Sequence, residues 1–271
     1  MKIGDALYLL KEQNTAEMKI LLEETLCLSK TQMLTHPERE IEPPLQKLLL
    51  QRIGELKDGR PLQYILGKWE FMGREFAVGE GVLIPREDTQ ALVELAGEFL
   101  KNKTNTTFAD LGSGSGCIAV LLASDFAAKG YAVERSQKAY SFLKENAKQI
   151  DGSVECILGD MFSREVLEKL PQLELVVSNP PYITLEEIKS LDKCVLCEPK
   201  EALYGGDDGL YFYRKITAIY KNKLKEGGML CFEVGFGQAD AVLDILKSEG
   251  FHSPREKKDL SGIRRAVGAI K

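Results

Sequence analysis

Histidine, basic charge and long apolar runs are all scarce in this chain of 271 residues. Only two histidines occur, and acidic residues outnumber basic ones by 41 to 36, so the formal net charge is -5. Domains that grip nucleic acid through its phosphates usually carry a basic excess, so direct nucleic-acid binding is not expected. The longest apolar run, CIAVLLASDFAA, is well short of the roughly 20 residues that a membrane helix needs. The first residues, MKIGDALYLLKEQN, are too polar for a signal peptide. We therefore expect a cytoplasmic protein without a membrane partner.

A metal site is not expected either. Six cysteines are scattered along the chain, mostly within apolar stretches, as reduced buried thiols are. Only Cys194 and Cys197 form a C-x-x-C pair. A zinc site would need two further ligands, and the chain has no second C-x-x-C and only His36 and His252 to offer.

The first 67 residues are predicted to be helical. The segment 16–30 places five residues at helical spacing on one face: Met18, Leu21, Leu22, Thr25 and Leu26. The segment 43–60 repeats this pattern between two prolines at its start and Asp58-Gly59 at its end. After it, Trp69 and Phe71 alternate with polar residues before Gly73, as Phe76 and Val78 do after it, which predicts a β-hairpin.

From Pro85 onward, predicted strands alternate with predicted helices, which favours an α/β fold with a mostly parallel sheet covered on both faces. The final two strands have no helix between them, so we expect the last to insert antiparallel and complete a seven-stranded sheet. The strands are predicted at 107–111, 131–134, 154–158, 173–178, 228–234, 251–257 and 264–270.

A glycine-rich loop follows the first of these strands. Its glycines are spaced G-x-G-x-G, which differs from the G-x-G-x-x-G of dinucleotide sites. Asp110 lies just ahead of the loop, and a carboxylate there would attract a cofactor with a cationic amino group and a sulfonium. S-adenosylmethionine has that character. The loop consists of Gly112, Ser113, Gly114, Ser115 and Gly116.

Acidic residues also end the next two predicted strands. Glu134 could accept hydrogen bonds from both ribose hydroxyls, and Asp160 could accept one from the adenine amino group. Met161 could cover the adenine ring. Each residue alone is more typical of a surface acid or a core methionine, but their order and their places at strand ends favour cofactor binding.

Asn179, Pro180, Pro181 and Tyr182 follow the strand at 173–178 and should face the same cleft, beside the cofactor. The prolines fix φ and remove two N–H donors. The Asn179 side-chain oxygen and the Pro180 carbonyl would form two acceptors for a planar NH2 group, and Tyr182 would offer a flat face for stacking. This arrangement predicts methyl transfer to an amide or amino nitrogen, without an obligatory general base.

With these motifs, the chain resembles the glutamine methyltransferases of the PrmC/HemK family, which modify the Gly-Gly-Gln glutamine of peptide chain release factors. The resemblance covers nearly the whole chain. It implies a Rossmann-like class I methyltransferase fold in three parts: a helical substrate-recognition domain (1–67), a β-hairpin linker (68–84) and a methyltransferase domain (85–271). It rests on the blocks EFMGREF, VLIPRED, DLGSGSGCIA, NPPY, EPKEALYGGDDGLYFYR and FEVGFGQ.

The resemblance also implies roles for particular residues. Gly112 to Gly116, Glu134 and Met161 would bind S-adenosylmethionine, and Asn179 to Tyr182 would hold the substrate glutamine. Phe71 resembles the family's aromatic residue near the substrate amide. Glu198 and Pro199 match a shared block that we interpret as shaping the loop after Tyr182.

The chain departs from the family's pattern at four positions. Glu87 stands where a proline is usual and Gln90 where an acid is usual, which leaves the role of Arg86 open. Glu134 replaces an aspartate, and Met161 stands where an aromatic residue is common.

Three other interpretations compete with a release factor methyltransferase. A glutamine methyltransferase acting on a ribosomal protein would share this catalytic core. An adenine-N6 amino methyltransferase of nucleic acid would share NPPY, although the acidic composition and the EPKEAL block count against it. A binding module without catalysis is disfavoured by the intact GSGSG and NPPY motifs.

Overall fold

The computed structural model describes residues 1–13, 16–149 and 153–271, and the chain divides into two compact units. The smaller unit comprises Met1–Lys68 and Lys193–Cys197, and the larger comprises Trp69–Asp192 and Glu198–Lys271. The larger unit holds both the glycine loop and the Asn-Pro-Pro-Tyr motif. All the residues predicted to touch cofactor or substrate therefore belong to one compact body.

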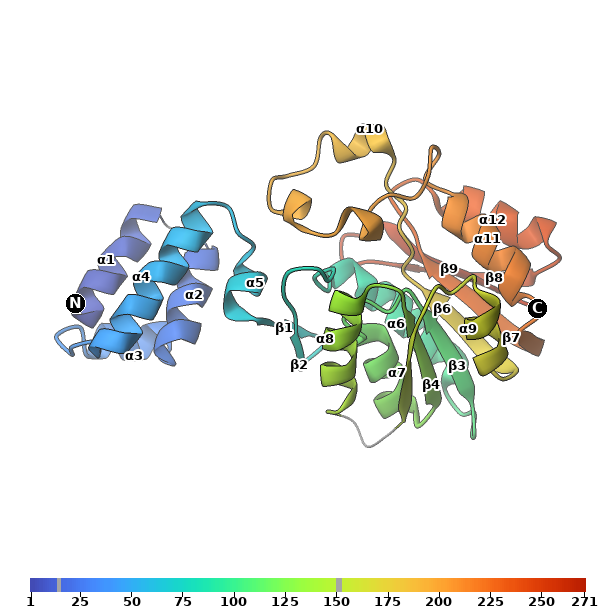
Figure 1. Ribbon diagram of the computed structural model, residues 1–271, viewed down its shortest axis with the longest axis horizontal. Coiled ribbons are helices and arrows are strands. Elements are labelled where there is room, and N and C mark those ends of the chain that lie inside the picture. The colour runs from blue at the N-terminus through green and yellow to red at the C-terminus, as the bar shows by residue number, and fades with distance from the viewer. Residues whose placement is uncertain (14–15, 150–152) are drawn as a thin grey trace. The chain divides into compact units, whose positions relative to one another are not determined.

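Helices build the smaller unit: α1 (Ile3–Gln13), α2 (Ala16–Leu26), α3 (Lys30–Thr35), α4 (Pro43–Lys57) and α5 (Leu62–Leu66) (Figure 1). Helix α2 packs against α4 and α5. Its apolar face is confirmed, because its buried residues are the five predicted from helical spacing, Met18, Leu21, Leu22, Thr25 and Leu26.

The helix predicted over 16–30 is two helices. Cys27 adopts a φ of 52°, a left-handed conformation that cannot continue an α-helix. Ser29 then begins α3 with a capping box, in which its hydroxyl accepts from the Gln32 amide and the Gln32 side chain accepts from the Ser29 amide. Apolar periodicity does not report single φ angles, so it did not reveal this break.

The predicted β-hairpin is confirmed. Strands β1 (Lys68–Phe71) and β2 (Arg74–Ala77) are joined by Met72 and Gly73, whose φ values are 49° and 75°. Two consecutive positive φ values are typical of the type I′ turn, whose twist matches that of the strands. Phe71 and Phe76 are both buried, with ring centroids 6.5 Å apart.

The larger unit is built on the predicted seven-stranded sheet, with the order β5-β4-β3-β6-β7-β9-β8. Strands β3 to β7 pair in parallel, and β9 lies antiparallel between β7 and β8, as expected for a last strand that inserts without a crossover helix. The strands are β3 (Thr107–Leu111), β4 (Lys129–Glu134), β5 (Val154–Leu158), β6 (Leu173–Ser178), β7 (Leu224–Glu233), β8 (His252–Lys258) and β9 (Arg264–Ile270).

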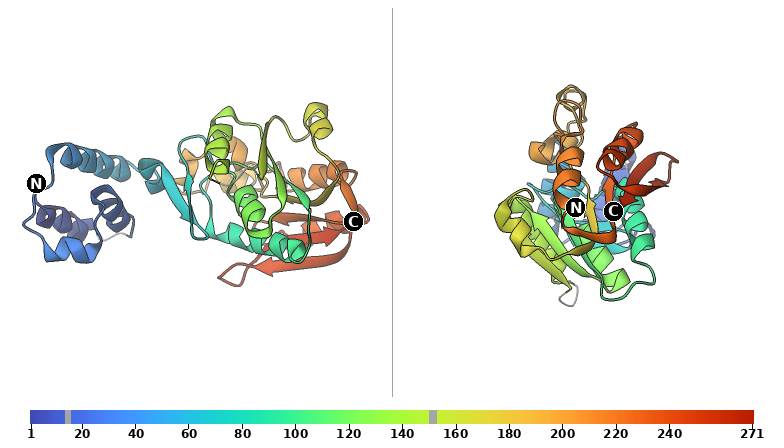
Figure 2. Two further views of the ribbon diagram at one scale, coloured as in Figure 1. Left: turned by 90° about the horizontal axis from the view of Figure 1, so that it is seen from below. Right: turned by 90° about the vertical axis from the view of Figure 1, so that its right-hand side faces the viewer.

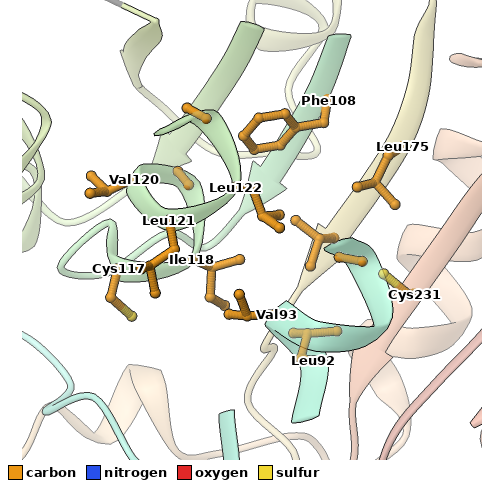
Figure 3. Packing of buried hydrophobic residues seen from close by; sticks show 14 of the residues in the cluster. Leu92, Val93, Phe108, Cys117, Ile118, Val120, Leu121, Leu122, Leu175 and Cys231 are labelled. Carbon is orange, nitrogen blue, oxygen red and sulfur yellow. The ribbon is translucent and has the colours of Figure 1, made fainter. Parts of the chain in front are cut away.

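Two layers of helices enclose this sheet (Figures 1 and 2). One core cluster joins the sheet to α6 (Gln90–Leu100), α7 (Cys117–Phe126) and α8 (Gln137–Ala147). Figure 3 shows its packing, in which Leu122 of α7 lies on the same side of the sheet as Phe108 of β3 and Leu175 of β6. The second cluster joins the other face to α9 (Arg164–Lys169), α11 (Tyr211–Tyr220) and α12 (Ala239–Ser248).

Short helical turns complete the larger unit. The turn η1 (Glu87–Thr89) precedes α6, while α10 (Leu185–Ile188) and η3 (Lys200–Ala202) lie between β6 and α11. The turn η2 (Val195–Cys197), in the same connection, belongs to the smaller unit.

The sheet order decides where a site can form. From β3 the chain proceeds through β4 to β5 on one side, whereas β6 lies on the other side of β3 and leads to β7. Loops that leave the carboxyl ends of β3 and β6 therefore diverge at a topological switch point, where open α/β sheets bind ligands. The Ser178 hydroxyl donates to the Leu111 carbonyl at 2.6 Å and joins the ends of these two strands.

Candidate active site

A cavity of about 510 Å³ opens at the carboxyl ends of β3 to β6. Small-molecule and cofactor sites usually have volumes of roughly 300 to 1,000 Å³. Nine of the predicted site residues line this cavity, although they come from four different loops: Gly112, Ser113, Gly114, Ser115, Glu134, Asp160, Met161, Asn179 and Pro181.

The alternating glycines have a conformational cause. Gly112, Gly114 and Gly116 have φ values of 73°, 55° and 82°, in the left-handed region that side chains rarely adopt. A Cβ on Gly116 would also lie 2.5 Å from the Leu143 Cδ1 atom, so α7 could not begin so close to α8. A Cβ on Gly112 would lie 3.4 Å from the Met161 Cε atom, on the wall of the cavity. The spacing G-x-G-x-G is thus required by backbone geometry and by packing.

Glu134 connects the end of β4 to the glycine loop. Its carboxylate accepts hydrogen bonds from the Gly114 amide at 2.9 Å and from the Ser136 amide at 2.6 Å. One of its oxygens serves each amide, so each oxygen still has a lone pair for a further donor. The backbone therefore fixes this carboxylate at the cavity wall without exhausting its capacity.

Asp110 lies below the glycine loop and does not line the cavity. Its side chain is fully buried, and neither carboxylate oxygen has a hydrogen-bond partner among the described residues. Burial raises the pKa of Asp110 to about 7, while weaker contacts with the Ser113 side chain and the Ala119 backbone oppose this rise. The expected attraction of this carboxylate to a cationic cofactor would therefore have to act through the loop.

Asp160 and Met161 follow β5 and line the same cavity. One Asp160 oxygen, Oδ1, accepts from the Phe162 amide at 2.9 Å. The Met161 carbonyl accepts from the Tyr220 hydroxyl of α11 at 2.7 Å, so the second helix layer holds this turn in place.

Asn179 lies at the exit of β6, with its side-chain amide oriented by a neighbour. The Asn179 Nδ2 atom donates to the Thr89 Oγ1 atom at 3.4 Å. This contact uses one of the two Nδ2 hydrogens, and Oδ1 is an acceptor that the contact leaves unused. That this oxygen receives a substrate NH2 group stays a prediction.

The remaining motif residues are less accessible than the sequence indicated. Pro180 is buried and Tyr182 does not line the cavity, whereas Pro181 does. The Tyr182 hydroxyl donates to the Glu233 Oε1 atom at 3.4 Å, and its carbonyl accepts from the Gln238 Nε2 atom at 3.0 Å. Burial raises the pKa of the Tyr182 hydroxyl well above its usual value, so it stays protonated as a donor.

Phe71 was predicted near the substrate amide, but it does not line the cavity. Its side chain is only 5% exposed and packs with Phe76 in the core cluster of the first helix layer. Asn146 of α8 holds this hairpin against the glycine loop, because its amide bonds both backbone groups of Ala77 and the carbonyl of Ser115. The role of Phe71 toward a substrate stays a prediction.

Two family models match the chain: residues 8–67 match the PrmC N-terminal domain, and residues 88–209 match the methyltransferase small domain. The release factor glutamine methyltransferase of Clostridium acetobutylicum is 36% identical to the chain, with coverage of 100% of this chain and 99% of that protein. The chain belongs to the release factor glutamine methyltransferase family. A further member, from Bordetella pertussis, is 34% identical over 93% of each protein.

The family resemblance predicted from the motifs is therefore confirmed, and solved structures agree on the fold. A methyltransferase from Pyrococcus furiosus superposes with a TM-score of 0.54 at 17% identity, covering 83% of this chain and 97% of that one. The hMettl16 catalytic domain, solved with a MAT2A 3′UTR hairpin, gives a TM-score of 0.59 at 15% identity, covering 84% and 82%. At such identities the likeness shows the class I methyltransferase fold and nothing finer.

Sequence reasoning overlooked an aromatic wall that this family member has at the cavity. Phe162 and Phe212 stack with centroids 6.1 Å apart, and the Lys215 Nζ atom lies 4.0 Å from the Phe162 ring centroid. Tyr211 accepts a hydrogen bond from Lys215 at 3.1 Å. All four residues line the cavity. The block GLYFYR contained two of them, Tyr211 and Phe212, but no pattern within it indicated which faced the ligand.

Arg86, whose role the sequence left open, forms an ion pair with Glu198, which we interpreted as shaping the loop after Tyr182. The Glu198 side chain is 1% exposed, and its second oxygen accepts from the Ile84 amide at 3.2 Å. Burial raises the pKa of Glu198, and the Arg86 guanidinium opposes that rise. This pair ties the loop after Tyr182 to the segment before η1.

Within residues 1–13, 16–149 and 153–271, no three histidine, cysteine or acidic residues gather as a metal site would require. No helix in the described part of the chain has the length and apolarity to cross a membrane.

Proposed function

We propose that this protein transfers the methyl group of S-adenosylmethionine to N5 of the glutamine in the Gly-Gly-Gln motif of peptide chain release factors. Family membership supports the reaction and the partner. The observation that supports the chemistry is the place of Asn179, which lines the cavity and whose Nδ2 atom donates to the Thr89 hydroxyl, a contact that does not use Oδ1. A free acceptor at this place suits a substrate NH2 group.

The residues around the cavity fit the cofactor. The positive φ values of the glycine loop allow its backbone to approach a ligand closely, and Glu134 keeps lone pairs for two ribose hydroxyls. Asp160 keeps one oxygen for the adenine amino group, and Met161 lies where it would cover the ring. When bound, the cofactor supplies an electrophilic methyl group on a sulfonium.

The substrate amide would be held by the Asn179 Oδ1 atom and the Pro180 carbonyl, which accept its two N–H hydrogens. Accepting both hydrogens turns the nitrogen lone pair toward the methyl group, and such positioning can contribute several kcal/mol to the lowering of a barrier, up to about 7 to 11. Tyr182 supports this turn from behind through Glu233 and Gln238. The nitrogen becomes acidic once it is alkylated and releases its proton to water. This step needs no general base from a histidine, and neither His36 nor His252 lines the cavity.

This proposal gives each of the three parts of the chain its own role. Residues 85–271 would carry the methyl transfer, residues 68–84 would link the parts, and residues 1–67 would recognise the release factor. The proposal places the protein in the cytoplasm, where release factors act.

A ribosomal protein is the second candidate substrate, because it would present the same glutamine amide to the same acceptors. The net charge of -5 supports a protein substrate over nucleic acid, whose phosphates it would repel.

Mass spectrometry tests the proposal. The protein would be incubated with S-adenosylmethionine and one candidate substrate in each reaction. The candidates are an unmethylated release factor, the same factor with its Gly-Gly-Gln glutamine replaced by alanine, ribosomal proteins, and DNA or RNA. One added methyl group on the release factor, absent from the alanine variant, is expected. Methylation of a ribosomal protein alone would keep the reaction and refute the partner, and methylation of nucleic acid alone would refute both.

A further inference from the structure

The block FEVGFGQ ends in a glutamine whose side chain bonds to the Asn-Pro-Pro-Tyr motif. Gln238 is the N-cap residue of α12, but its side chain makes no capping hydrogen bond. Instead its Nε2 atom donates to the Tyr182 carbonyl at 3.0 Å, and its Oε1 atom accepts from the Gly235 amide at 3.0 Å. The Gln238 side chain therefore serves the motif and the loop before α12, and not the helix that it begins.

The orientation of the Gln238 amide is determined by its two backbone partners. A backbone amide can only donate and a backbone carbonyl can only accept, so Oε1 must face Gly235 and Nε2 must face Tyr182. The two orientations of a side-chain amide have nearly the same shape, and partners of fixed polarity distinguish them. The donor that reaches the Tyr182 carbonyl is thus fixed by the fold.

Two glycines make room for this hydrogen bond. A Cβ on Gly209 would lie 2.4 Å from the Tyr182 carbonyl oxygen and 2.6 Å from the Gln238 Nε2 atom. A Cβ on Gly235 would lie 3.0 Å from the Tyr182 Cδ2 atom and 2.8 Å from the Gln238 Oε1 atom. A side chain at either position would displace the bonded groups, so the surrounding backbone is shaped around this contact.

The Tyr182 carbonyl lies two peptide units beyond the Pro180 carbonyl, which is the proposed second acceptor for the substrate NH2 group. The rings of Pro180 and Pro181 fix φ at both residues, so the direction of the Pro180 carbonyl depends on the few torsions that remain in the turn. Ser178 holds the upstream end of the turn through its bond to β3, and Gln238 holds the downstream end through Tyr182.

We propose that Gln238 is a positioning residue that holds the Tyr182 carbonyl and thereby keeps the Pro180 carbonyl aimed at the substrate amide. This inference rests on the proposed function, because it concerns the acceptor pair of that site. Gln238 does not line the cavity, so its effect on the reaction passes through Tyr182. A misplacement of about 1 Å in a group that orients a substrate can lower a rate by about 100-fold.

Kinetics with the full-length protein and an unmethylated release factor test this proposal. Gln238→Met keeps the length of the side chain and removes the donor, so kcat should fall about tenfold or more. The KM for the release factor and the affinity for S-adenosylmethionine by calorimetry should change by less than about twofold, because the loss concerns orientation in the transition state. Gln172→Met is the matched control and should keep the wild-type kcat. The Gln172 Nε2 atom also donates to a backbone carbonyl, that of Asn222 at 3.2 Å, but it lies at the amino end of β6.

Gln238→Glu supplies a second test, because its ability to donate depends on pH. The ionised side chain can only accept and would face the Tyr182 carbonyl without a hydrogen, whereas the protonated side chain can donate to it and still accept from Gly235. The kcat of Gln238→Glu relative to wild type should therefore rise as the pH is lowered from about 9 to about 6. This ratio cancels the titration of nearby groups that both proteins share, which are Asp88, Tyr182, Tyr213, Glu233, Arg265 and the ion pairs Asp208–Arg214 and Asp240–Arg264.

A wild-type kcat in Gln238→Met would overturn the positioning role. A loss of S-adenosylmethionine affinity as large as the loss of kcat would also overturn it, because the loop would then serve the cofactor. A ratio for Gln238→Glu that did not change with pH would contradict the donor role of Nε2, and this comparison still decides if Gln238→Met does not fold. Failure of the proposed function itself is distinguishable, because the unmutated protein would then not methylate the release factor.

Discussion

Replacement of Asp110 by asparagine should change how stability depends on pH. Asp110 is fully buried, its two carboxylate oxygens lack partners among the described residues, and burial raises its pKa from 3.8 to about 7. Between these two pH values the unfolded chain is ionised at this residue while the native protein holds a proton. The native state therefore binds more protons, and its stability falls as the pH rises through this interval. Above about pH 7 no further loss from Asp110 is expected.

The size of the effect follows from the width of the interval. One unit of pKa corresponds to about 1.4 kcal/mol, so the two units between pH 5 and pH 7 amount to about 3 kcal/mol. Asparagine has no proton to lose. The free energy of unfolding of Asp110→Asn should therefore gain about 3 kcal/mol relative to wild type between pH 5 and pH 8. Glu233, whose pKa is also raised to about 7, contributes equally to both proteins and cancels in this comparison.

Urea unfolding without cofactor, at pH 5 and at pH 8, measures this difference. Asp240→Asn serves as the control, because the Arg264 guanidinium lowers the pKa of the exposed Asp240 carboxyl and keeps it ionised at both pH values. The stability difference between this control and wild type should be the same at the two pH values. If the difference between Asp110→Asn and wild type were also constant to within about 1 kcal/mol, Asp110 would be ionised in the native protein and the burial argument would be refuted.

Three further substitutions test the site. Asn179→Ala should lower kcat by about two to three orders of magnitude and leave cofactor affinity largely intact, because it removes an acceptor that orients the reacting nitrogen; retained turnover would contradict this role. Glu134→Ala should weaken S-adenosylmethionine binding, and calorimetry that found the wild-type affinity would rule out its ribose contact. Arg86→Met should lower the free energy of unfolding by about 1 to 3 kcal/mol, which is less than the loss of a fully buried pair because Arg86 is partly exposed. Adding Glu198→Gln to the same chain should recover most of this loss. Urea unfolding measures both, and a stable single variant would show that the ion pair contributes little.

Much of the fold was predictable because periodicity reports which side of an element is covered. The five buried residues of α2, the hairpin around Gly73 and the strand at 107–111 were all readable in this way. The antiparallel last strand followed from the absence of a helix before it. The break at Cys27 was missed, because it consists of one left-handed φ angle and apolar periodicity does not report single φ angles.

The site was predicted less completely. The glycine loop and Asn179 were found because each is a short motif whose residues act together in sequence. Arg86 with Glu198, and Tyr182 with Glu233, are separated by 112 and 51 residues, and no local pattern connects them. Asp110 was expected to act beside the ligand and is instead buried below the loop, because the first residue of a loop and the last residues of a buried strand look alike in one sequence.

The sequence by itself determined the family, the α/β alternation and the types of atom offered to a cofactor and to an amide, since these depend on residue identity and local spacing. Only the tertiary structure decided which of those atoms are free. The Asn179 amide nitrogen donates to Thr89, and the Tyr182 hydroxyl donates to the buried Glu233. Hydrogen-bond direction and burial are properties of neighbours in space, and the packing of β6, β7 and η1 brings these neighbours together.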